Sequence, residues 1–133
     1  MLEIANLTKK RIDKKLFEKI YKIVLKGEKA KGDISLVFVD SRKMKSLNLF
    51  WRKRNSCTDV LSFSNISDKI LGEIFICPDY IKKISKDYKK ESVRAFIHGV
   101  LHLLGKEHDT KKQTEEIISI ENKYIKKLWP KTR

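Results

Sequence analysis

Residues 91–108 read ESVRAFIHGVLHLLGKEH, and the fold is expected to form around this stretch. From Glu91 to Leu104 it is apolar on nearly every side of a helix, which predicts a central helix that its neighbours bury. Gly105 suits the left-handed turn with which many helices end. The other segments are therefore expected to pack around this helix.

The segments on either side of this helix alternate between helix and strand patterns. Strands are expected where β-branched and aromatic residues lie between turn-forming ones, at residues 2–6, 34–39, 60–63 and 71–77. Apolar residues at every fourth position from Ile12 predict a helix that ends at Gly27, and further helices are expected at 41–50, 79–88 and 110–128. Interleaved helices and strands around a small sheet indicate one α+β domain over residues 1–133.

Two of these helices have recognisable first residues. Ser41 is of the type that caps a helix N-terminus, and the helix after it is expected to carry Met44, Leu47 and Phe50 on one side. Thr110, with a glutamine three residues later, has the pattern of a capping box that opens the last helix.

The charge of the chain favours a polyanionic partner. Lys and Arg total 31 against 17 Asp and Glu, a net charge of +14 at pH 7. Such a field attracts nucleic acids. A lysine-rich proteome would produce the same excess, so charge alone leaves RNA binding open.

Cysteine content and hydropathy predict a cytoplasmic protein. Cys57 and Cys77 have no short Cys-x-x-Cys spacing and are expected to be free thiols, with a disulfide between them as the alternative. The longest apolar stretch, residues 95–104, is too short for a membrane span, and the first residues lack the pattern of a signal peptide.

All three histidines of the chain fall within eleven residues, at positions 98, 102 and 108. His98 and His102, four residues apart, lie on one side of a helix. Gly105 lets the chain turn back, so that His108 can supply a third nitrogen. Three protein ligands with one open position are typical of a catalytic zinc site, although nickel, copper or iron would also accept imidazoles.

The alternative is that these are ordinary core histidines, but unpaired imidazoles are costly to bury in an apolar helix. The spacing is also that of the metzincin proteases, His-Glu-x-x-His-x-x-Gly-x-x-His. Here, however, Gly99 stands where that signature has its general-base Glu. No methionine follows the motif, so the Met-turn of those enzymes is missing too. These differences disfavour peptide hydrolysis.

Three blocks of the sequence resemble the YbeY family of bacterial endoribonucleases. Residues 98–108 resemble the family motif His-Gly-x-Leu-His-Leu-x-Gly-x-Asp-His. A second block, upstream, joins Leu47-Asn48, Trp51-Arg52 and Thr58-Asp-Val-Leu-Ser-Phe63, and the third is Leu71-Gly-Glu-Ile74. Both resemble family blocks that occur in the same order. Glu107 replaces the family's Asp, and Cys57 replaces a Pro.

The resemblance implies a zincin-like α+β fold with a small mixed sheet, packed by helices that include a central metal-binding helix. It implies a metal-dependent endoribonuclease that acts on single-stranded RNA. The expected roles are maturation of ribosomal RNA, at the 3′ end of 16S rRNA, and ribosome quality control. The expected partners are ribosomal RNA and the ribosome or its proteins, with no membrane and no nucleotide cofactor.

The resemblance also makes Arg52 the expected catalytic residue, because it matches the family's functionally important arginine. A guanidinium can clamp a phosphodiester and balance its charge, whereas the position of Arg52 alone favours a solvated cation in a basic loop. Asp59 either approaches the metal site or only caps a turn. Asp109 caps or turns the chain after His108, or else supports a ligand imidazole.

The resulting hypothesis is one Zn²⁺ per chain held by His98, His102 and His108, with Arg52 on the scissile phosphate and lysines on the RNA backbone. The nucleophile, a metal-activated water or the RNA 2′-hydroxyl, stays open, and Glu107 is a weak candidate for the general base. Two rivals remain: a metal-dependent hydrolase of peptides or small molecules, and a ribosome assembly factor with a structural zinc. Trp51 and Tyr124 can stack on bases, but aromatic residues on a helix face usually belong to the core.

Overall fold

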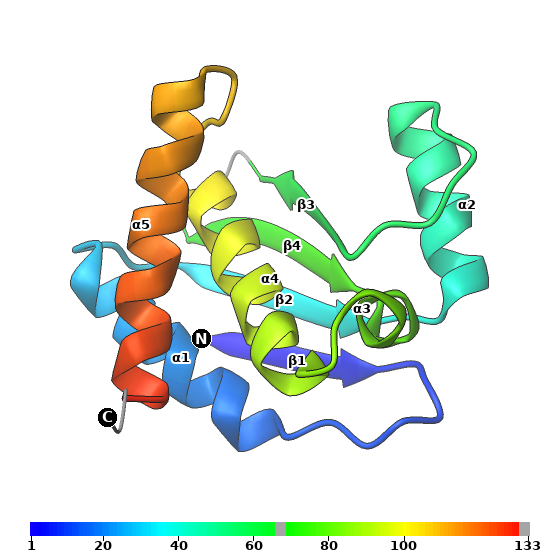
Figure 1. Ribbon diagram of the computed structural model, residues 1–133, viewed down its shortest axis with the longest axis horizontal. Helices are drawn as coiled ribbons and strands as arrows, with labels where there is room; N and C mark the ends of the chain where they lie inside the picture. Colours follow the sequence, from blue (N-terminus) through cyan, green and yellow to red (C-terminus); the bar gives the residue numbers. More distant parts are fainter. Residues whose placement is uncertain (66–68, 131–133) are drawn as a thin grey trace.

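The computed structural model describes residues 1–65 and 69–130, and its strands form one mixed sheet. The strands are β1 (Leu2–Asn6), β2 (Asp33–Phe38), β3 (Val60–Ser64) and β4 (Ile70–Ile76), in the spatial order β1-β2-β4-β3. β1, β2 and β4 run parallel, and β3 pairs antiparallel with β4 at the edge of the sheet (Figure 1). The expected α+β fold with a small mixed sheet is confirmed.

The helices are α1 (Lys14–Gly27), α2 (Ser41–Arg52), α3 (Pro78–Ile84), α4 (Tyr88–Leu103) and α5 (Lys111–Leu128). α4 lies across the sheet and contacts β3 and β4, with α1 and α5 packed against it, whereas α2 stands apart from the other helices (Figure 1). Within the described part of the chain, no helix is long and apolar enough to cross a membrane.

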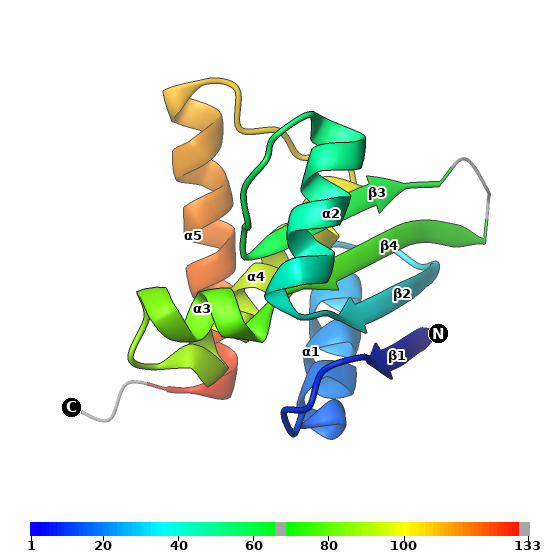
Figure 2. The same ribbon diagram turned by 90° about the vertical axis from the view of Figure 1, so that its right-hand side faces the viewer.

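Alternating side chains of the sheet enter two cores. Ile34, Leu36 and Phe38 of β2 belong to the main core, which α1, α4 and α5 complete. Val37, between them in sequence, packs against a smaller cluster on which α2 lies. The members of that cluster are Val39, Met44, Leu61 and Cys77. The sheet therefore has α4 on one face and α2 on the other, as the side view from α2 illustrates (Figure 2).

Two expectations about α2 are wrong. Its cap is Asp40, whose carboxylate accepts the amide hydrogen of Lys43 at 2.8 Å, while Ser41 is the first helical residue. Phe50 is 70% exposed and does not share the buried side with Met44. Phe50 comes six residues after Met44, and at 3.6 residues per turn it lies about a third of a turn away.

The helix expected at 79–88 ends earlier, and α4 begins before Glu91. α3 stops at Ile84, and Asp87 then caps α4 by accepting the amide hydrogen of Lys90 at 3.3 Å. The capping box of Thr110 and Gln113 at the start of α5 is confirmed, with both of its reciprocal hydrogen bonds present.

Candidate metal centre

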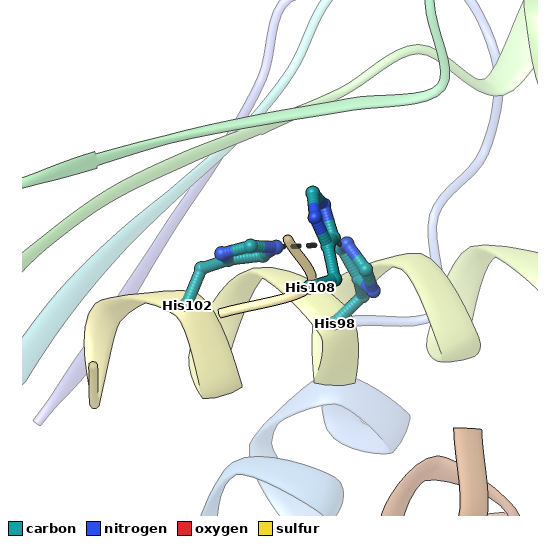
Figure 3. A group of neighbouring side chains, drawn as sticks. All are labelled: His98, His102 and His108. Carbon is teal, nitrogen blue, oxygen red and sulfur yellow. Dashed lines mark hydrogen bonds between the residues drawn. The ribbon is translucent and has the colours of Figure 1, made fainter. Parts of the chain in front are cut away.

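α4 buries most of its surface and leaves His98 and His102 half-buried on its remaining side. From Ser92 onward the helix is buried over the sheet and against α1 and α5, because its residues there, apart from Arg94 and the two histidines, are apolar or small. The spacing of four residues brings the two rings together, with Nε2 of His102 3.0 Å from Nε2 of His98 (Figure 3). One end of each imidazole therefore points toward a common position.

The turn after α4 brings the third histidine to the same place. Gly105 has a φ of +93°, which side-chain-bearing residues rarely adopt, and its amide donates to the carbonyl of His102. After this turn the ring centroid of His108 lies 4.6 Å from that of His102 and 5.5 Å from that of His98. The Thr114 hydroxyl donates to the carbonyl of His108 at 3.2 Å and fixes the loop to α5.

The three imidazoles form a group that can hold a metal ion. Each offers a ring nitrogen, and these atoms lie within 4.8 Å of one another. Burial lowers the pKa of His102, and electrostatic interactions with His98, His108 and Arg52 lower it further. A lowered pKa keeps this imidazole neutral, which is the form that binds metal. Three imidazole nitrogen donors suit zinc and its transition-metal neighbours better than magnesium or calcium.

Glu121 of α5 fixes the ring of His98, and sequence reasoning missed it. Its carboxylate accepts the Nδ1 hydrogen of His98 at 2.7 Å, while its other oxygen lies 3.6 Å from Nη1 of Arg94. The side chain is only 5% exposed. A carboxylate on Nδ1 leaves Nε2 free to bind metal and makes it more basic.

Gly99 faces the sheet, which explains the missing general base. A Cβ atom at this position would lie 3.0 Å from Cδ1 and Cγ2 of Ile74 in β4. A glutamate side chain would therefore have to displace Ile74 in the core. The packing of α4 on β4 leaves no room for the metzincin Glu.

Arg52 and the three histidines line one hollow. Its volume is about 380 Å³, and its other wall is formed by residues 58–63 of β3 and the loop before it. Arg52 is the last residue of α2 and is exposed. The structure therefore brings together all four residues that the sequence singled out, although they come from both faces of the sheet.

Asn48 places the loop that follows Arg52. It is 3% exposed, and its Nδ2 donates to the carbonyl of Ser56 at 2.9 Å. Lys53 ends α2 in the left-handed conformation, with φ of 59°, which turns the chain toward β3. Asn48 thus has a structural role in positioning the wall of the hollow.

The remaining acidic candidates have different surroundings. Asp59 lines the hollow with the histidines and also accepts the amide hydrogen of Val60 at 2.8 Å, so it both lies at the site and caps a turn. Glu107 and Asp109 are exposed, and within residues 1–65 and 69–130 neither side chain has a hydrogen bond to a histidine. The Asp109 amide donates to Gln113, so its backbone turns the chain.

Fold and site together define an α+β protein with a three-histidine group able to hold a metal, set on a helix and the turn after it. The model of the family described as "Endoribonuclease YbeY" matches residues 3–129. The chain belongs to this family.

Individual proteins agree with this assignment. The chain is 33% identical over 138 residues to an "Endoribonuclease YbeY" of Phytoplasma australiense, a match that covers 96% of this chain and 94% of the relative. A protein of the same description from Bdellovibrio bacteriovorus is 42% identical over 93 residues, which span 67% of this chain and 62% of the relative. The solution structure of TM1509 from Thermotoga maritima is similar with a TM-score of 0.69 and 28% identity, covering 97% of this chain and 89% of that one.

Proposed function

We propose that residues 1–133 form a zinc-dependent endoribonuclease domain that cuts single-stranded RNA, with His98, His102 and His108 as the zinc ligands and Arg52 as the catalytic residue. Membership of the endoribonuclease YbeY family makes the protein an RNA-hydrolysing enzyme. The proposed biological setting is the cytoplasm, where the protein matures the 3′ end of 16S rRNA and takes part in ribosome quality control through contacts with the ribosome.

The observation that carries this proposal is the shared hollow of Arg52 and the three histidines. A divalent metal held by the imidazoles would polarise a phosphoryl oxygen and acidify a water molecule. The Arg52 guanidinium can donate two hydrogen bonds to the same phosphate and offset its negative charge. Asp59, half-buried on the wall between them, is a further carboxylate that faces the hollow.

Peptide hydrolysis has less support. The residue after His98 is Gly99, which packs closely against Ile74. The general-base glutamate of the related protease signature therefore has no counterpart there. RNA cleavage has two candidate nucleophiles, a water molecule acidified by the metal and the 2′-hydroxyl of the RNA itself.

A cleavage assay with product analysis tests the function. Labelled single-stranded RNA, the same RNA in a duplex and a casein peptide mixture are incubated with the protein, with and without a chelator. We expect chelator-sensitive cutting of the single strand alone. Products with 2′,3′-cyclic phosphates would assign the 2′-hydroxyl as nucleophile, and 5′-phosphates would assign water. Cleavage of peptides with intact RNA would contradict the proposal.

Replacing Glu121 with glutamine is expected to weaken zinc binding about 10- to 100-fold, the usual effect of losing the carboxylate partner of a ligating histidine. Glutamine keeps the size of the side chain but lacks its charge, so Nε2 of His98 becomes less basic. The measurement is competition with a chromophoric chelator. Glu116→Gln, an exposed change on the same helix, is the control. Equal affinities of the two variants would show that Glu121 does not support the ligand.

A further inference from the structure

Two large aromatic side chains are exposed at the end of α2. Phe50 is 70% exposed and Trp51 60%, and their ring centroids lie 4.9 Å apart. They directly precede Arg52. Adjacent exposed aromatic side chains at the rim of a candidate active site are typical of a binding surface.

Trp51 also forms one wall of a second hollow. Its ring packs against Phe63 at 5.6 Å between centroids, and Phe63 packs against Phe75 at 5.9 Å. The hollow has a volume of about 460 Å³. Leu47 completes its apolar lining, and its polar lining consists of Ser62, Ser64 and Glu73. We call it the aromatic hollow.

The aromatic hollow adjoins the metal centre. Ser62 and Phe63 of β3 line both this hollow and the one that contains the histidines. Arg52 lines the hollow that contains the histidines, and Trp51, the residue before it, lines the aromatic hollow. A ligand held at Arg52 can therefore extend onto the ring of Trp51, at the C-terminal end of α2, which is the upper end of this helix in Figure 2.

The charges favour a nucleic acid strand with its base in the aromatic hollow and its phosphates outside. Residues 41–56 carry six basic side chains and no acidic one, and Lys53 and Arg54 are exposed just beyond Trp51. Such cations attract phosphates. Inside the hollow, the exposed carboxylate of Glu73 repels a phosphate but can accept hydrogen bonds from the amino group of a base.

We propose that the aromatic hollow is a base-stacking subsite, in which an unpaired nucleotide next to the scissile phosphate stacks on Trp51. The proposal rests on the proposed function, since it places the base relative to Arg52 and the histidines. A base in a duplex is already paired and stacked and cannot enter the hollow. The subsite therefore gives a physical reason for a preference for single strands.

Fluorescence tests the stacking directly. The chain has two tryptophans, so Trp129→Phe leaves Trp51 as the only one. The full-length variant is titrated with a single-stranded, 2′-O-methylated RNA oligonucleotide, whose integrity is checked on a gel. We expect strong quenching of Trp51 emission. Inorganic polyphosphate, which carries charge but no bases, should bind without this quenching. Equal responses to both probes would overturn the proposal.

A second variant tests how much Trp51 contributes to the binding of RNA. Trp51→Ala is expected to raise the Kd for the oligonucleotide, and the KM for RNA cleavage, roughly 5- to 100-fold with little change in kcat. Tyr88→Ala is the matched control, because Tyr88 is also an exposed aromatic near a lysine, but it is the first residue of α4 and lines neither this hollow nor the one with the histidines. An unchanged Kd in Trp51→Ala, or an equal loss in Tyr88→Ala, would overturn the subsite.

The outcomes separate this proposal from the proposed function. Wild-type cleavage of RNA with an unaffected Trp51→Ala variant removes the subsite and leaves the nuclease in place, with the aromatic surface free for a protein partner. Quenching by the oligonucleotide without any cleavage supports the subsite and removes the nuclease function.

Discussion

Replacing His108 with alanine is expected to remove bound metal and RNA cleavage while leaving the fold intact. His108 is exposed in the loop after α4 and supplies the third nitrogen of the group. With two imidazoles left, zinc affinity should fall more than about 100-fold, beyond the effect of losing a supporting carboxylate. Cleavage should fall roughly 10³-fold or more, because a catalytic metal supplies several kcal/mol of transition-state stabilisation. Metal content by mass spectrometry and cleavage rates measure both effects.

Lys106→Ala is the control for His108→Ala, since it truncates an exposed side chain of the same loop. With metal removed by a chelator, both variants should melt at the temperature of the metal-free wild type, because neither side chain is in the core. A His108→Ala protein that retained one zinc per chain and normal cleavage would contradict the ligand assignment.

Replacing Arg52 with alanine should reduce turnover strongly but leave metal content unchanged. The guanidinium lines the hollow without belonging to the group of nitrogen donors, so its removal affects the phosphate rather than the metal. Losing one hydrogen-bond donor that stabilises the charge of the transition state lowers kcat about 10²- to 10³-fold. Arg52→Lys should recover part of the rate, since it restores charge without the two-pronged geometry.

Arg42→Ala, an exposed change at the other end of α2, is the control for general loss of positive charge. It should lower RNA affinity only slightly and leave kcat unchanged. Loss of zinc in Arg52→Ala would contradict the division of roles between guanidinium and imidazoles. Equal loss of turnover in both variants would reduce Arg52 to one of many solvated cations.

The features that could be predicted from the sequence are those with local causes. The burial of α4 follows from its apolar composition, and the meeting of His98 with His102 follows from helical periodicity. The position of His108 follows from the turn at Gly105, which lies between His102 and His108. The place of Arg52 beside these residues depended on the family resemblance, because α2 and α4 lie on different faces of the sheet.

Other features arise from tertiary packing, which the sequence does not show directly. Glu121 reaches His98 across 23 residues, and this contact exists only because α5 packs along α4. A signal was present: Glu121 lies four residues after Ile117 and three before Tyr124, on the buried side of α5. A charged residue on an apolar helix face needs a partner. Tyr124 is fully buried, as expected of a core aromatic, whereas Trp51 is exposed because α2 covers only part of its sheet face.

Reconstitution with metal tests the central claim most directly. Protein stripped by a chelator is titrated with Zn²⁺ while bound metal and cleavage of single-stranded RNA are followed together. We predict that both rise in parallel and saturate at one equivalent per chain, and that His108→Ala shows neither rise. Cleavage that is complete before any metal is added, or zinc binding at one equivalent without cleavage, would contradict a catalytic metal at the three histidines.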